Sequence, residues 1–290
     1  MKWIREIGPG ILIAAAFIGP GTVTLCTIAG VSYGYSLIWA LVLSIFATIF
    51  LQELSLRVGL ATKMNVAEVI SKSIKSIYLN KFLIVLIISS ILIGNAAYEA
   101  GNITGASLGI SGIINNDSIS YIPVFIGIAA FLILFQGNYK LIEKSLIFLV
   151  LTMSISFFIT AIITKPNLKY LIEGMFIPSF DDNSILIVLG LIGTTVVPYN
   201  IFLHSSLVTE KWDSIKKLKT ARIESFLSIF LGGIVSLSII VTAASVNTQD
   251  VKSVIDLARG LEPLYGKFAI YFLGIGLFAS GITSSITAPL

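Results

Sequence analysis

The sequence predicts an all-α membrane protein that crosses the bilayer eight times. Hydrophobic residues fill 56% of its 290 positions and charged residues only 12%, a balance that excludes an ordinary soluble domain. A membrane-spanning helix needs about 20 consecutive apolar residues. Long uncharged windows meet that need, and the first is long enough for two spans: 7–52, 82–98, 118–139, 145–164, 183–209, 225–249 and 268–290.

Basic residues in the predicted loops orient the chain. Most of the 19 Lys and Arg residues fall on one side of the membrane, in the N-terminus and in segments 57–81, 140–144 and 211–222. The positive-inside rule places that side, and therefore the N-terminus, in the cytoplasm. We expect a multi-pass protein of the cell membrane (plasma or inner membrane) that contacts the lipid bilayer. Because the loops explain the basic balance, no nucleic-acid partner is expected.

Proline interrupts two of the predicted spans near their middle. In the sixth span Pro198 cannot donate its N–H, so the helix should open over 194–200. Gly19-Pro20-Gly21-Thr22 interrupts the first span in the same way. Backbone groups freed at that depth are tolerated only where they face protein or a wet cavity. Paired breaks in corresponding segments of two halves are typical of secondary transporters, so the substrate site is predicted between the first and sixth helices.

These breaks predict an inverted repeat. Residues 1–165 hold the first repeat of five helices. Because five is odd, the next helix enters the membrane from the opposite face. Residues 166–290 hold an external loop and the first three helices of the second repeat, so we expect an incomplete chain that lacks the last two helices.

The first repeat is predicted element by element. The first span runs over 8–31 and the second over 36–60, where Glu53 and Arg57 are four residues apart and can pair. The linker 62–81 should hold one short helix. In the third span Gly101, Gly105 and Gly109 form a ladder suited to close helix packing. The fourth and fifth spans follow over 118–139 and 145–164.

The second repeat begins with a loop over 168–183 that should hold a short helix before Pro178. The broken sixth span and a basic link over 211–222 come next, then the seventh span over 223–246. A short external amphipathic helix is predicted within 248–266. The eighth span, 268–290, carries hydroxyl residues from Ser280 to Ser285 that can bond to their own helix backbone.

Glu99 is the most informative single charge, because no other Asp, Glu, Lys, Arg or His occurs between Phe82 and Asn116. Asn95 and Asn102 share its helix face. Carboxylates inside membrane spans are costly and mark ion or proton pathways. We therefore expect Glu99 to titrate during transport; the alternative is a hydrogen-bonded structural Glu.

The chain resembles the Nramp family of proton-coupled divalent-metal transporters, which have the LeuT fold of two inverted five-helix repeats. The resemblance extends from Gly8 to Pro289. Five motifs carry it: Gly-Pro-Gly-Thr (19–22) with Tyr-Gly-Tyr-Ser-Leu-Ile-Trp (33–39), Leu-Gln-Glu-Leu-Ser-Leu-Arg-Val-Gly (51–59), Thr-Val-Val-Pro-Tyr-Asn-Ile-Phe-Leu-His-Ser (195–205), Leu-Glu-Pro-Leu-Tyr-Gly (261–266) and Ala-Ser-Gly-Ile-Thr-Ser-Ser (279–285).

The departures from the family pattern fall on the implied metal site. In the first break the family has Asp-Pro-Gly-Asn, and this chain has Gly19 and Thr22 at the two ligand positions. In the sixth span the family has Met-Pro-His-Asn, where Val197 replaces Met and Tyr199 replaces His. The family's proton route includes an acidic pair in the third span, of which Glu99 remains while Ala96 stands at the other position. A further family histidine matches His204.

Neutral oxygens are what can still coordinate an ion at the implied site. The candidate substrate-binding residues, with Thr22 and Asn200 as metal ligands, are Ala16, Gly19, Thr22, Thr194, Val197, Tyr199 and Asn200. Loss of the thioether argues against selectivity for Mn²⁺ or Fe²⁺. Loss of the carboxylate leaves a dehydrated divalent ion without an anionic partner.

Three functions remain open at this stage. The first is an Nramp-type secondary active transporter that imports an inorganic cation, foremost a divalent metal ion, by symport with protons along Glu99 and His204. A hard ion such as Mg²⁺, which keeps more of its water, would suit this site. The second is a transporter of the same fold for a small polar organic solute. The third is a transport-incompetent fragment or regulatory membrane protein. No enzyme and no cofactor are expected, because His204 and Cys26 lack companions at useful spacing.

Overall fold

A computed structural model of the chain describes residues 19–114, 121–136, 140–179, 182–212, 214–245, 256, 258 and 261–287. Every regular element in these ranges is a helix, and no strand occurs among them. The structure therefore confirms the predicted all-α class.

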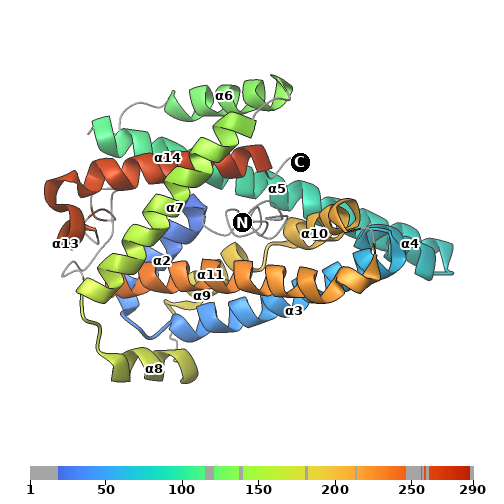
Figure 1. The fold of residues 1–290 in the computed structure, drawn as a ribbon, viewed down its shortest axis with the longest axis horizontal. Coiled ribbons are helices and arrows are strands. Elements are labelled where there is room, and N and C mark those ends of the chain that lie inside the picture. Colours follow the sequence, from blue (N-terminus) through green and yellow to red (C-terminus); the bar gives the residue numbers. More distant parts are fainter. Residues whose placement is uncertain are drawn as a thin grey trace.

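The helices of the first half lie along the predicted spans (Figure 1), with two differences: the third long helix begins at Ile77, inside the predicted linker 62–81, and the described part of the fourth, Ile122–Gln136, is shorter than a membrane span. These helices are α2 (Pro20–Tyr33), α3 (Ile38–Thr62), α4 (Val66–Ser73), α5 (Ile77–Ile114), α6 (Ile122–Gln136) and α7 (Lys140–Ile163). The start of the predicted first span, with candidate site residue Ala16, lies outside the described residues. The short helix expected in the linker is α4, which Asn65 caps by accepting a hydrogen bond of 2.9 Å from the Glu68 N–H.

The second half contains two half-helices where one span was predicted. Its elements are α8 (Leu168–Phe176), α9 (Ile185–Thr195), α10 (Pro198–Lys211), η2 (Ile215–Lys217), α11 (Leu218–Ala244), α13 (Glu262–Tyr265), η3 (Gly266–Phe268) and α14 (Ala269–Thr287). The helix expected before Pro178 is α8. Most of the amphipathic helix expected within 248–266 lies outside the described residues. Its end coincides with α13.

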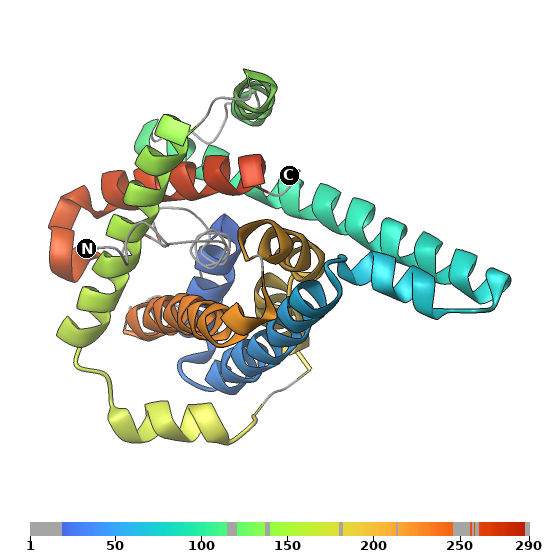
Figure 2. The ribbon, with the colours of Figure 1, turned by 45° about the vertical axis from the view of Figure 1, so that its right-hand side comes forward.

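Helix length and composition support a multi-pass membrane protein. Five described helical stretches are long and apolar enough to cross a membrane, and one of them runs across the break between α9 and α10. The end of α7 and α8 form a sixth candidate, bent by 120°. Figure 2 shows α8 crossing between α7 and α3 at one end of the molecule, while α6 lies at its edge.

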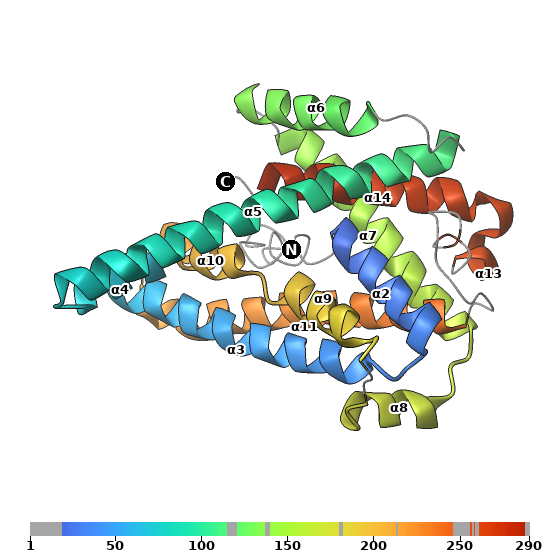
Figure 3. The same ribbon diagram turned by 180° about the vertical axis from the view of Figure 1, so that it is seen from behind.

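Two helices cross the molecule in close contact, and glycines allow their approach. Along one face α14 packs against α5, as seen from behind in Figure 3. A Cβ at Gly109 would overlap the carbonyl oxygen of Gly274, and a Cβ at Gly105 would overlap the side chain of Pro20. The predicted packing ladder is correct for these two glycines. It is wrong for Gly101, where an added Cβ would meet no atom of the described residues within 4 Å.

The buried core lies where α11 packs against α2 and α3. Val23, Cys26 and Ala29 of α2 are fully buried there, as are Ile239 and Ile240 of α11. This packing holds α2 rigidly beside α9 and so positions the candidate site.

Candidate substrate site at the broken helix

The sixth predicted span is broken where the sequence predicts it. Between α9, which ends at Thr195, and α10, which begins at Pro198, Val196 (φ −89°, ψ 79°) and Val197 (φ −92°, ψ 117°) leave the helical conformation. Pro198 occupies the first turn of α10, where a missing N–H costs nothing. Pro198 therefore starts α10, and because its ring clashes with the preceding turn, α9 cannot continue into α10 as one regular helix.

The start of α2 lies against this break. Gly19 is extended (φ −82°, ψ 167°) and Pro20 opens the helix, which matches the outer half of the predicted first break. A Cβ on Gly21 would lie 3.7 Å from Cγ2 of Thr194. The two interrupted segments, 178 positions apart at their prolines, therefore meet in space.

Hydroxyl groups from two other helices satisfy carbonyls at the end of α9. The Tyr98 hydroxyl of α5 donates to the Gly193 oxygen at 2.6 Å. The Thr48 hydroxyl of α3 is shared between the Ser44 oxygen of its own helix, at 2.8 Å, and the Thr195 oxygen, at 3.2 Å. Thr194 uses its own hydroxyl within the helix, donating to Leu191 at 3.2 Å. The group of Thr194 that can still bind a substrate is therefore its backbone carbonyl, as the sequence predicts.

The candidate ligands of α2 and α10 are buried. Thr22 is 4% exposed and Asn200 2% exposed, while Val197 and Tyr199 are also buried. The side-chain nitrogen of Asn200 has no hydrogen-bond partner within the described part of the chain. Buried polar groups normally have a hydrogen-bond partner. The unpaired amide of Asn200 therefore suggests a position where a ligand would bind.

Tyr98 is a site residue that the sequence analysis missed. Its ring contacts Tyr199 edge-on, with centroids 5.8 Å apart and planes at 76°, and it packs on Val197. The feature of the sequence that could have indicated Tyr98 is its position next to Glu99 in a mainly apolar span. Tyrosine is too common in membrane helices for that signal to be specific.

Glu99 lies at the edge of the same region, half-buried on α5. The Asn102 amide nitrogen donates to its carboxylate at a long 3.5 Å, which agrees with the predicted shared face. The Ser285 hydroxyl of α14 lies beside the Glu99 carboxylate and has no other hydrogen-bond partner among the described residues. Glu99 is close enough for its charge to act on Tyr199.

His204 lies one helical turn beyond Asn200 on α10 and is buried, with 2% exposed. Its ring contacts the backbone of Gln52 in α3, and its Nδ1 atom has no partner in the ranges that the structure describes. A cavity of about 10 Å³ adjoins the ring. The structure thus places four of the sequence-predicted residues on the break itself, with the α2 residues Gly19 and Thr22 close by in sequence to its contact at Gly21 and with His204 one turn further along α10: Thr194, Val197, Tyr199 and Asn200.

Ion pairs lie at the end of the molecule beyond His204. Glu53 binds Arg57 at 2.6 Å, as predicted, and also Arg222 at 2.9 Å. Among the described residues no three His, Cys, Asp or Glu side chains are grouped to hold a metal ion. The segments 19–22 and 194–200 themselves carry no carboxylate.

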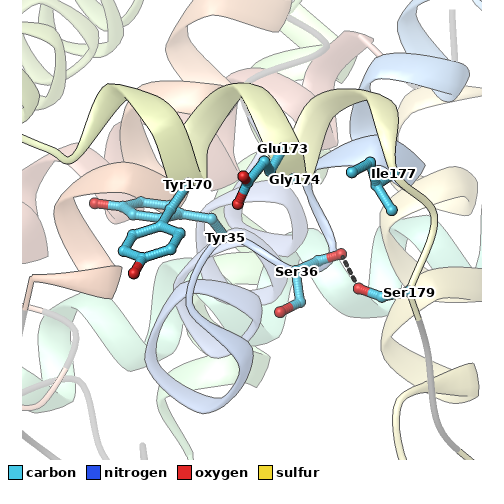
Figure 4. Close-up of a pocket in the computed structure, with 7 residues that line it drawn as sticks. All are labelled: Tyr35, Ser36, Tyr170, Glu173, Gly174, Ile177 and Ser179. Atoms are coloured by element: carbon cyan, nitrogen blue, oxygen red, sulfur yellow. Dashed lines mark hydrogen bonds between the residues drawn. The ribbon is translucent and has the colours of Figure 1, made fainter.

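A separate pocket opens between α8 and the turn that joins α2 to α3 (Figure 4). Its volume is about 360 Å³, and none of the candidate site residues lines it. Tyr35 and Tyr170 lie at one end, and the Ser179 hydroxyl donates to the Ser36 oxygen at 3.2 Å at the other. This hydrogen bond helps to fasten α8 to the α2–α3 turn.

Half-helices that meet in the middle of a helical membrane protein define the class of transporters with the LeuT-like fold. Comparison with known families is consistent with this class: the family described as Natural resistance-associated macrophage protein-like matches residues 10–290. The chain belongs to the Nramp family, whose members are transporters and not enzymes.

Individual relatives agree with the family. The chain is 28% identical over 301 residues to the divalent metal cation transporter MntH of Caldanaerobacter subterraneus, covering 100% of this chain and 70% of the relative. It is 32% identical to the metal transporter Nramp2 of Populus trichocarpa, covering 97% of this chain and 54% of the relative.

A solved structure shows the same fold. The crystal structure of the Eremococcus coleocola manganese transporter, in complex with an aromatic bis-isothiourea substituted compound, superposes with a TM-score of 0.77 at 19% identity. The match covers 97% of this chain and 63% of that chain, so this sequence spans less than two thirds of the transporter's length.

Proposed function

We propose that this chain carries the substrate site of an Nramp-type secondary active transporter that imports a divalent metal cation. One observation carries the proposal: the break between α9 and α10 lies against the extended start of α2, at Thr194 and Gly21. Broken helices that meet at mid-depth are how transporters of this fold build an ion site. The names of the relatives supply the substrate class, divalent metal cations.

The chemistry of the buried groups favours a hard cation that keeps part of its water. Thr22, Tyr199 and Asn200 offer a hydroxyl, a phenol and an amide oxygen, and Val197 offers no ligand atom where the family has a thioether. Soft ligands select transition metals, whereas carbonyl, hydroxyl and water oxygens suit Mg²⁺ and Mn²⁺. Retained water also lowers the cost of holding a divalent charge without a carboxylate.

Proton coupling belongs to the same proposal. Glu99 lies beside Tyr199, and His204 follows Asn200 by one turn on α10. Both side chains can exchange protons and flank the cation site from different helices. We place the N-terminus in the cytoplasm of a cell-membrane protein from the positive-inside pattern, with repeats over 1–165 and 166–290.

A small polar organic solute is the second candidate, and Asn200 favours it. The unpartnered Nδ2 atom of Asn200 is a donor, and it lies in the first turn of α10. A helix N-terminus and a neighbouring amide donor suit a carboxylate rather than a cation. An amino acid or a similar anion would use this pair directly.

Calorimetry on the purified protein separates the two candidates. We expect Mg²⁺ or Mn²⁺ to bind and a panel of amino acids not to bind, and we expect Asn200→Ala to remove the binding heat. The matched control is Thr104→Ala, because Thr104 is exposed and, among the described residues, its hydroxyl donates only within its own helix, to the Ala100 oxygen at 2.6 Å. Amino-acid binding without metal binding would establish the second candidate. A protein that binds neither would contradict both.

A further inference from the structure

One face of α8 forms a wall of the pocket beside the α2–α3 turn. Tyr170, Glu173, Gly174 and Ile177 all line this pocket, and they are spaced i, i+3, i+4 and i+7 along the chain. Residues at this spacing share one face of a helix. The turn between α2 and α3 supplies the opposite wall. The pocket is therefore built from one helix face and one turn.

Contacts at both ends hold these two walls together. A Cβ at Gly174 would overlap the carbonyl oxygen of Tyr35, so glycine lets α8 lie directly against the turn. The Trp39 indole N–H donates to the Ser179 oxygen at 3.1 Å, and the Ser179 hydroxyl donates to the Ser36 oxygen at 3.2 Å. The pocket volume is about 360 Å³. Small-molecule sites measure roughly 300–1,000 Å³ and are usually preformed in this way.

A single carboxylate sets the charge of the pocket. Of the described residues that line it, only Glu173 is charged, and Figure 4 shows the carboxylate directed from α8 toward the turn. Its ion pair with Lys169 is long, at 3.9 Å, and the side chains of Glu173 and Lys169 are 45% and 78% exposed. An exposed pair of this kind contributes little. A bound cation can therefore replace Lys169 at the carboxylate.

Aromatic and apolar groups decide which kind of cation fits. Tyr35 is half-buried and Tyr170 is exposed, and both lie at one end of the pocket. The face of a tyrosine ring attracts a positive charge, which is how proteins recognise quaternary ammonium groups. Ile177 adds apolar surface. A metal ion would use the carboxylate but not this apolar surface, whereas an ammonium ion with an apolar body would use both.

We propose that this pocket binds a small organic ammonium ion. The positive nitrogen lies between the Glu173 carboxylate and the rings of Tyr35 and Tyr170, and the apolar part of the molecule extends toward Ile177. None of the candidate substrate residues lines the pocket. The pocket is thus a second binding site, and the proposal stands apart from the transport function proposed above.

Ligand-observed NMR titration of the purified protein tests the charge requirement. The probe is choline, and its neutral counterpart is 3,3-dimethylbutan-1-ol, which has nearly the same shape. We expect choline to bind, more weakly as ionic strength rises, and the alcohol not to bind. Glu173→Gln should weaken choline binding about fivefold, and Lys169→Ala should tighten it about twofold because a competing ammonium is removed. The matched control is Glu68→Gln, which removes an exposed carboxylate of α4 and should have no effect.

Two further variants test the kind of ligand and the place where it binds. Tyr170→Leu should weaken choline binding about threefold, since it removes a ring that attracts the cation. Asn200→Ala, at the broken helix, should leave choline binding unchanged.

Four results would overturn the proposal. The first is no binding of choline, and the second is equal binding of choline and the alcohol. The third is a loss in Glu173→Gln with none in Tyr170→Leu, which would show a carboxylate that attracts any cation. The fourth is a loss in Asn200→Ala with none in Glu173→Gln, which would place choline at the broken helix and support the second candidate function.

Discussion

The Tyr98 hydroxyl of α5 donates a 2.6 Å hydrogen bond to the carbonyl oxygen of Gly193, in the last turn of α9. The last four carbonyls of a helix have no partner within it, and the break after Thr195 leaves Gly193 in this position. The same tyrosine ring packs edge-on against Tyr199 in the first turn of α10. One side chain of α5 therefore contacts both halves of the broken helix and holds their relative position.

Tyr98→Phe should separate the two roles of this side chain. The ring and its contact with Tyr199 remain, but the Gly193 carbonyl loses its donor. An unpaired buried carbonyl costs about 1–3 kcal/mol, so we expect a lower unfolding temperature and weaker cation binding. Tyr98→Leu, which also removes the ring contact, should weaken both further. Thermal unfolding followed by fluorescence and calorimetric titration would measure these effects; unchanged binding in both variants would contradict the holding role.

Gly105 brings α5 into contact with the start of α2. A Cβ at this position would overlap the side chain of Pro20, and Pro20 cannot move without displacing Gly19 and Thr22. We therefore expect Gly105→Ala to reduce cation affinity by about tenfold, or roughly 1.4 kcal/mol, although no ligand group is altered. Binding calorimetry would detect this change.

The control for that variant lies one turn earlier on the same helix. In the part of the chain that the structure describes, an added Cβ at Gly101 would meet nothing within 4 Å. Gly101→Ala should therefore bind the cation normally and stabilise the helix slightly, since alanine has the better helix propensity. Equal losses in the two variants would show that the effect comes from α5 in general rather than from its contact with Pro20.

The sequence was sufficient to locate the break but not to show what supports it. Pro198 is a local signal, because a proline inside an apolar span forbids the regular helix wherever it occurs. The Gly105 contact is similarly visible as a four-residue spacing, although spacing alone could not distinguish Gly105 from Gly101. Both signals lie in residues close together in the chain, whereas the contact of Gly105 with Pro20 joins residues 85 positions apart.

Long-range pairings could not be predicted in the same way. The Tyr98–Gly193 hydrogen bond joins residues 95 positions apart, and the Thr48–Thr195 bond joins residues 147 apart. The cavity beside His204 is likewise formed by three separate helices, α3, α10 and α11. Serine and threonine add a further ambiguity, because many bond their own helix: Ser280 and Thr283 do so as predicted, whereas Ser284 and Ser285 show no partner among the described residues.

Glu99→Gln should uncouple proton movement from cation binding. The amide keeps the shape of the carboxylate and can still bond Asn102, but it cannot take up or release a proton. We expect cation binding to persist while cation-driven proton flux in liposomes falls at least tenfold. Unchanged proton flux in this variant would reject Glu99 as a proton carrier and leave it a structural role.

The last prediction concerns the charge that the site lacks. Gly19 stands where the family pattern has a metal-binding Asp, and it is the residue that caps the N-terminus of α2. Its backbone is extended (φ −82°, ψ 167°), a conformation that aspartate adopts without strain. Aspartate is also among the preferred residues at a helix N-cap. Gly19→Asp should therefore fold normally and place a carboxylate beside Thr22 and the break.

A carboxylate in this position changes the electrostatics of the candidate site. Its negative charge would face any bound divalent ion at short range in a buried region, where charge pairs are worth more than in water. We expect Gly19→Asp to raise Mn²⁺ affinity by tenfold or more, about 1.4 kcal/mol per factor of ten, and to weaken any binding of carboxylate solutes. Gly19→Asn has nearly the same shape and no charge, so it should leave Mn²⁺ affinity close to its original value. Calorimetric titration of the three proteins would measure this, and equal affinities would show that the cation does not bind at this break.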